Sequence, residues 1–222
     1  MDKSELDVAA LETVSFAKNY NNYVFNLILA RINGERIADF GAGYGNFCLF
    51  LKSKKKDVVA VEVNEKAIQK LEESHIPNYK NLEELKVKYH TIVSLNVLEH
   101  IDDDLKVLTE MSKYLDTDGK IILYLPSSQI IWSELDELVN HKRRYSRKLI
   151  KKLAVGANLE INQIISVDFV GWAVILLSKL LPIKMDFSKN KIVFYDKFIF
   201  KYLDLIFKNV IGKNLLIVLS KK

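Results

Sequence analysis

The sequence predicts an α/β protein with a doubly wound, mostly parallel sheet and helices on both faces. Apolar segments of strand length alternate along the chain with segments of helical length, which is the order that builds parallel sheets. Three alternate glycines, Gly41, Gly43 and Gly45, follow the first expected strand, where such a fold turns from strand into helix. With 222 residues, 49% of them hydrophobic, the chain can form one domain with a sizeable core.

Each element is expected from its own local pattern. Strands are expected near 36–41, 57–62, 79–82, 91–97, 120–125, 159–168 and 214–220. Helices are expected over 8–32, 45–54, 65–74, 102–115 and 146–155. Asp118-Gly119 is typical of a turn, and the stretch after Pro126 is expected to be irregular. We therefore expect a single domain over 1–222, with an N-terminal helical cap at 1–34 and a helical insertion at about 169–211.

The glycine string defines the first functional motif. From Asp39 onward the chain reads Asp-Phe-Gly-Ala-Gly-Tyr-Gly-Asn, and a dinucleotide loop of the G-x-G-x-x-G type would need a glycine at Asn46 or Cys48. The spacing Asp-x-Gly-x-Gly-x-Gly instead resembles the first motif of the class I S-adenosylmethionine-dependent methyltransferases. A plain turn between strand and helix is the alternative.

A carboxylate stands at the expected distance from this loop. The segment 57–62 ends in Glu62, 21 residues after Gly41. In doubly wound sheets an acid about 20 residues past the glycine loop accepts hydrogen bonds from the ribose hydroxyls. A surface glutamate at a strand end is the alternative interpretation.

A second motif supports the same family. The segment 91–104 reads Thr-Ile-Val-Ser-Leu-Asn-Val-Leu-Glu-His-Ile-Asp-Asp-Asp, and its Leu-Glu-His resembles small-molecule methyltransferases of the ubiquinone-biosynthesis type. The segment from Asp136 to Ser146 resembles a subgroup found among polysaccharide and glycolipid enzymes. The chain departs from its relatives at His90 and Asn81, where many of them have an acid. The resemblance implies a seven-stranded sheet whose last strand is antiparallel.

The resemblance also implies a site for S-adenosylmethionine and its product S-adenosylhomocysteine. Asp39 would order the loop or face the ammonium group, Glu62 would hold the ribose, and Val63 would pack on the adenine. Tyr20 could cover the cofactor or be a surface aromatic. The expected cofactor-binding residues are Tyr20, Asp39, Gly41, Ala42, Gly43, Gly45, Glu62, Val63, Asn81, Leu82, Asn96 and Val97.

Catalysis requires a base only if the acceptor is a hydroxyl or an ammonium group. His100 is the first candidate because an imidazole titrates near neutral pH, and His141 is the second. His100 could instead pack against the start of the following helix and hydrogen-bond to it. We expect no metal site, and the single Cys48 excludes a cysteine cluster for zinc.

A basic segment is the candidate for substrate binding. The range 141–148 contains five Lys or Arg, and Arg143, Arg144 and Tyr145 could contact a phosphate or carboxylate of the substrate. The alternative is an internal ion pair between one arginine and Asp136.

Composition sets limits on partners and location. The formal charge of +5 is spread over mixed acids and bases, so nucleic-acid binding is not expected. The charged first residues resemble no signal peptide, which predicts a cytoplasmic protein. The apolar run Phe169–Leu177 is too short to span a bilayer. The stretch Val170–Leu181 could cover an apolar substrate or, with the stripe at 194–210, contact the inner face of a membrane. A core or dimer face is the more common explanation, and a monomer or a homodimer is expected.

We therefore expect methyl transfer to the oxygen or nitrogen of a small-molecule, glycan or lipid-linked acceptor. A non-catalytic cofactor-binding or scaffold protein of the same fold is the alternative. The sequence carries nothing that identifies the acceptor.

Overall fold

The computed structural model describes residues 18–180 and 211–222. The chain order is α2 (Lys18–Leu29), β1 (Arg36–Phe40), α3 (Asn46–Ser53), β2 (Asp57–Val61), α4 (Glu65–Glu73), β3 (Asn78–Tyr79), the 3-10 turn η1 (Leu82–Glu84), β4 (Tyr89–Leu95), η2 (Leu98–His100), α5 (Asp104–Lys113), β5 (Leu115–Pro126), η3 (Gln129–Ile131), α6 (Glu134–Leu138), α7 (Arg147–Gly156), β6 (Leu159–Val167), α8 (Phe169–Leu180) and β7 (Asn214–Lys221). The parts of the expected cap and insertion at 1–17 and 181–210, including the stripe at 194–210, lie outside the described residues.

The predicted fold class is confirmed. Seven strands form one sheet in the order β3-β2-β1-β4-β5-β7-β6. β7 runs antiparallel to both of its neighbours, whereas the other paired strands are parallel. The carboxyl ends of β1, β2, β4 and β5 therefore meet at one edge of the sheet, which is where ligands bind in doubly wound folds.

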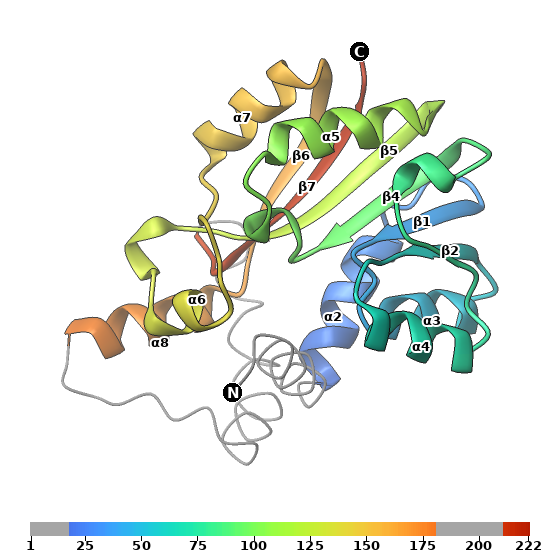
Figure 1. The fold of residues 1–222 in the computed structure, drawn as a ribbon. Helices are drawn as coiled ribbons and strands as arrows, with labels where there is room; N and C mark the ends of the chain where they lie inside the picture. Colours follow the sequence, from blue (N-terminus) through green and yellow to red (C-terminus); the bar gives the residue numbers. More distant parts are fainter. Residues whose placement is uncertain (1–17, 181–210) are drawn as a thin grey trace.

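The central strands contain long apolar runs because both faces of the sheet are covered. Helices α2, α3 and α4 lie on one face, and α5 and α7 lie on the other (Figure 1). Neighbouring residues belong to opposite cores: Ile121 and Leu123 pack with α5 and α7, while Ile122 packs with α2 and α3. This double burial explains the strands' unbroken apolar runs.

Three local expectations need correction. Asp118-Gly119 does not separate two elements, because β5 continues through it with an irregular register: Leu115 lies opposite Tyr89 and Lys120 opposite Thr91. The expected strand at 79–82 is the short β3 followed by η1. The stretch after Pro126 contains η3 and α6, and α6 begins with a capping box between Ser133 and Asp136.

Candidate functional site

The glycine loop joins β1 to α3 in a conformation that requires glycine. Gly41, Gly43 and Gly45 have φ values of 75°, 53° and 77°, in the left-handed region that side chains disfavour. A Cβ atom on Gly41 would lie 2.3 Å from Cγ2 of Val97, the residue just before η2. The loop from β1 therefore packs directly against the end of β4.

Glu62 holds this loop from the end of β2. Its Oε2 accepts a hydrogen bond from the Gly43 amide at 2.7 Å, and its Oε1 accepts from the amides of Val63 and Asn64 at 2.8 and 2.9 Å. A carboxylate has about four acceptor positions, so these three bonds leave capacity for a further donor. The carboxylate thus fixes the loop and lies where the sequence expected a ribose partner.

The residues beside Glu62 differ in what they present. Val63, two residues beyond the end of β2, is 76% exposed. Asn81 caps η1 by accepting a hydrogen bond from the Glu84 amide, and Leu82 is buried in the core. Val63 is therefore available to an apolar ligand surface, whereas Asn81 and Leu82 shape the edge beside it.

Asp39 lies beneath the loop. Its side chain is buried, accepts a hydrogen bond from the Cys48 thiol at 3.3 Å, and has a pKa raised to about 7, chiefly by burial. This contact ties the end of β1 to α3, the helix that follows the loop.

Tyr20 connects α2 to the same edge of the sheet. Its hydroxyl lies 2.6 Å from the hydroxyl of Tyr124 on β5 and accepts a hydrogen bond from the Asn214 amide group on β7. The Nζ atom of Lys213 lies 5.5 Å from the ring centroid. Tyr20 therefore holds the first described helix against the strand ends.

A buried acid, Glu99, lies in the turn η2 that follows β4. Asn96 has φ 52° and is exposed, and η2 follows with Leu98 and Glu99 buried and His100 exposed. Both Glu99 carboxylate oxygens are without a hydrogen-bond partner among the described residues. Burial raises the pKa of Glu99 to about 8.

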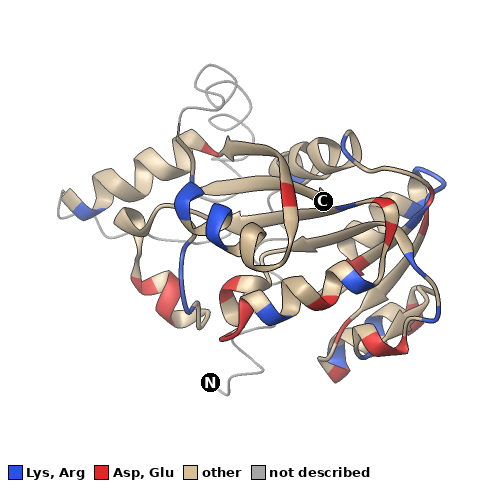
Figure 2. Cartoon of the chain, turned by 90° about the horizontal axis from the view of Figure 1, so that it is seen from above, with Lys and Arg blue, Asp and Glu red and all other residues tan. Residues whose placement is uncertain are grey.

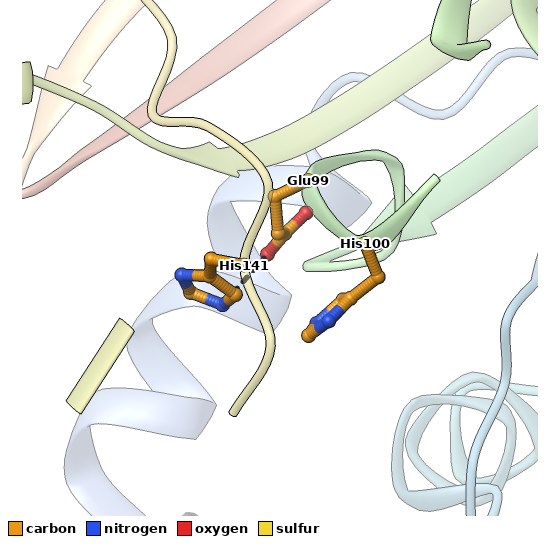
Figure 3. A group of neighbouring side chains, drawn as sticks. All are labelled: Glu99, His100 and His141. Atoms are coloured by element: carbon orange, nitrogen blue, oxygen red, sulfur yellow. Dashed lines mark ion pairs between the residues drawn. The ribbon is translucent and has the colours of Figure 1, made fainter. Parts of the chain in front are cut away.

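His141 reaches the same place from the segment after α6 (Figure 3). Its Nε2 lies 3.8 Å from Oε1 of Glu99, and its Nδ1 lies 2.7 Å from Oδ1 of Asp136. The rings of His141 and His100 meet edge to face with centroids 4.8 Å apart. The structure thus brings together both histidines that the sequence singled out.

Asp136 organises the basic segment from inside. Arg144 binds both of its carboxylate oxygens, at 2.8 and 3.0 Å, and donates to the Ser127 carbonyl. Although burial raises the pKa of Asp136, hydrogen bonds from His141 and Arg144 outweigh burial and lower it to about 2. Asp136 is therefore ionised at neutral pH and acts only as an acceptor.

The other residues expected to bind substrate also have internal partners. Arg143 forms an ion pair with Asp104 at 2.8 Å, and the buried Tyr145 donates to the same carboxylate at 2.9 Å. With Arg144 on Asp136, these contacts fasten the segment to α5 and α6.

Acidic and basic side chains are interspersed over the described elements (Figure 2).

Sequence reasoning gave too little weight to Glu99 and Asp136, which both lie beside His141. Glu99 belongs to the Leu-Glu-His motif, but the motif does not show that its side chain is buried. That burial depends on the segment 141–145, which packs over η2. The backbone bond from the Lys142 amide to the Glu99 carbonyl, 2.7 Å long, shows this contact. Nothing in local spacing predicts it.

The loop, the acid on β2 and the antiparallel last strand together define a class I S-adenosylmethionine-dependent methyltransferase. The loop after β1 has positive φ at Gly41, Gly43 and Gly45, Glu62 offers a carboxylate, and Val63 offers an exposed apolar contact. These residues fit the methionine, ribose and adenine parts of the cofactor.

Comparison with known proteins agrees. The family model described as methyltransferase domain matches residues 16–166, and the chain belongs to this family. No curated protein matches the sequence.

Solved structures with the same fold share little sequence. An S-adenosylmethionine-dependent methyltransferase from Thermotoga maritima is 15% identical with a TM-score of 0.68, over 96% of this chain and 95% of that one. Magnesium protoporphyrin IX methyltransferase from Synechocystis, with bound S-adenosylhomocysteine, is 12% identical with a TM-score of 0.60, over 100% and 89%. The glycopeptide N-methyltransferase MtfA, complexed with S-adenosylmethionine, is 11% identical with a TM-score of 0.61, over 90% and 86%.

Proposed function

We propose that this methyltransferase methylates an oxygen or nitrogen atom of a small-molecule, glycan or lipid-linked acceptor. The observation that carries the proposal is the group formed by Glu99, His100 and His141 beside the glycine loop. The connection is short, because Val97 packs on Gly41 and the His100 amide donates to the Val97 carbonyl at 3.0 Å. Proton-accepting side chains at this place suit an acceptor that carries a proton.

The proposed cofactor contacts follow the geometry of the strand ends. The backbone of 41–45 would line the methionine and ribose, Glu62 would accept from the ribose hydroxyls, and Val63 would pack against the adenine. Asn96 and Val97 would lie beneath the sulfonium and sugar. Asn81 and Leu82 would flank the base edge, and we assign Asp39 and Tyr20 to holding the loop and α2 in place.

The bound cofactor supplies a methyl group already activated by a sulfonium. The protein then has to exclude water, bring the acceptor atom to about 3–3.5 Å from that methyl and remove a proton where the acceptor has one. His100 is exposed at the mouth of the group and His141 is oriented by Asp136. We propose His100 as the base closest to the acceptor and His141 as the second candidate.

The basic segment takes a supporting role in this proposal. Arg144 and Tyr145 are buried on internal carboxylates, so we assign them to positioning His141. Arg143 retains 26% side-chain exposure beside Asp104, and it is the one of the three that an anionic acceptor could reach.

Calorimetry tests the cofactor assignment, with S-adenosylmethionine, S-adenosylhomocysteine and NAD titrated separately. Micromolar binding of the first two without binding of NAD is expected. Absence of heat with both sulfur ligands would overturn it. Transfer of radiolabelled methyl into fractionated cell extract tests turnover. Cofactor binding without any transfer would favour the non-catalytic alternative.

Peripheral membrane contact is proposed on a separate observation. Val174, Leu177 and Leu180 on α8 are 39%, 53% and 71% exposed. Among the described residues, no helix is long and apolar enough to cross a membrane. In a flotation experiment the unaltered protein should rise with anionic vesicles, whereas the Leu177→Glu variant should stay behind. A variant that rises as well as the unaltered protein would exclude this surface.

We also propose one methyltransferase domain over 1–222, which limited proteolysis would test.

A further inference from the structure

The carboxyl group of Glu99 lacks the hydrogen-bond partners that a buried polar group needs. The residue is 0% exposed, and neither oxygen has a hydrogen-bond partner among residues 18–180 and 211–222. The nearest titratable nitrogen is Nε2 of His141, and at 3.8 Å it is too distant for a hydrogen bond. A buried polar group without a partner is costly, so these two oxygens call for a binding partner that the described residues do not supply.

The orientation of His141 points to the kind of partner. Arg144 binds both oxygens of the ionised Asp136, which can therefore only accept hydrogen bonds. The Nδ1 atom of His141 thus carries a proton and donates a hydrogen bond to Asp136 at 2.7 Å. In the neutral ring the lone pair is then on Nε2, which faces Glu99 (Figure 3). In metal sites, a ligating histidine commonly donates a hydrogen bond from its other ring nitrogen to a carboxylate.

His100 supplies a third donor. One ligand atom from each of Glu99, His100 and His141 lies within 4.8 Å of the other two. An ion that binds at about 2.0–2.2 Å needs its ligands no more than about 4.4 Å apart, so small side-chain rotations would complete the site.

We propose that Glu99, His100 and His141 bind one divalent first-row transition-metal ion, with Zn²⁺ as the probe. Two imidazoles and one carboxylate are the donor set that such ions prefer over Mg²⁺ or Ca²⁺. This assignment departs from the expectation of no metal. Three protein ligands leave a coordination position open beside the glycine loop. The role of the ion rests on the proposed function. With the ion bound, His100 and His141 would act as its ligands instead of as bases, and an acceptor hydroxyl at the open position would lose its proton to water at a lower pH.

The binding test uses tag-free protein stripped with EDTA, titrated with Zn²⁺ in a calorimeter without cofactor. One ion per chain is expected. Glu99→Gln and His141→Ala should abolish this binding, and Asp136→Asn should weaken it by about 10–100-fold. His75→Asn is the matched control, because it removes a histidine outside the cluster. Asparagine tolerates the left-handed backbone conformation of this position, so the variant should bind Zn²⁺ like the unaltered protein.

Two further measurements separate the outcomes. Co²⁺ should give visible absorption bands that the Glu99→Gln variant lacks. The exposed His100→Ala variant avoids a substitution in the core, and it should bind Zn²⁺ more weakly while remaining folded. Absence of Zn²⁺ binding, or equal binding by Glu99→Gln, His100→Ala and His141→Ala, would overturn the site. A titration with S-adenosylmethionine on stripped protein reports on the proposed function independently.

Discussion

The side chain of Val97 occupies the space that a side chain at Gly41 would need. The two residues come from the ends of β4 and β1, and the nearest Val97 methyl would lie 2.3 Å from a Cβ atom on Gly41. The glycine loop and the turn η2 are thus set against each other by direct packing.

Gly41→Ala should therefore destabilise the protein and weaken cofactor binding. The added methyl clashes with Val97, and the left-handed φ of 75° costs about 1 kcal/mol or more for any side chain. Thermal unfolding and calorimetry with S-adenosylhomocysteine measure the two effects. Adding Val97→Ala should restore part of the stability. An undiminished loss in the double variant would show that the backbone conformation dominates.

Glu62→Gln should lower cofactor affinity by at least about 10-fold. The amide replaces one acceptor oxygen by a donor, so either Gly43 or the Val63 and Asn64 amides lose their partner, at a cost of about 1–3 kcal/mol. Calorimetry checks the affinity, with the exposed Glu72→Gln as the control. Equal affinity in Glu62→Gln and the control would remove Glu62 from the site.

Arg144→Ala should reduce the free energy of unfolding by about 3–5 kcal/mol, because it leaves Asp136 as a buried charge without its main partner. Urea denaturation measures the loss. The comparison is Arg36→Ala, which breaks an exposed pair with Asp116 and should cost less than about 1 kcal/mol. Similar losses in both variants would contradict the internal role of Arg144.

The pH dependence of stability should contain a contribution from Asp39. Burial raises its pKa to about 7 in the folded protein, so the folded state keeps a proton that the unfolded chain has lost above about pH 4. This stabilisation is complete below the unfolded pKa and disappears as the pH rises through about 7. A tenfold difference in proton affinity between the folded and unfolded states corresponds to about 1.4 kcal/mol.

Melting temperatures from pH 4 to 8 test this contribution. Asp39→Asn has no titratable group and should show a flatter decline than the unaltered protein. Asp57→Asn, exposed at the start of β2, should follow the unaltered protein. A decline as steep in Asp39→Asn as in the unaltered protein would mean that other groups cause it.

The elements of the sheet were predictable because local patterns determine them. The apolar runs of β1 and β2, the glycines after β1 and the cap Ser146 of α7 are properties of a few neighbouring residues. The antiparallel last strand came from family resemblance and is confirmed.

The partners of the basic segment were not predictable in the same way. Arg143 and Tyr145 meet Asp104 across 39 and more positions of sequence, and this pairing exists only once α5 and the segment are packed. An exposed arginine and a buried arginine look alike in sequence. The short helix α6 also escaped prediction, since its five residues carry too little periodicity.

The placement of β7 has a consequence for how the chain acquires its structure. Within the described strands, β6 pairs with β7 alone, and β7 also closes the ladder of β5. During synthesis, β6 therefore has no hydrogen-bonding partner until the ribosome has added residues 214–221. Until then the edge of β5 stays open, and contacts of such sequence separation form slowly. We expect this half of the sheet to assemble last and to be where misfolding begins.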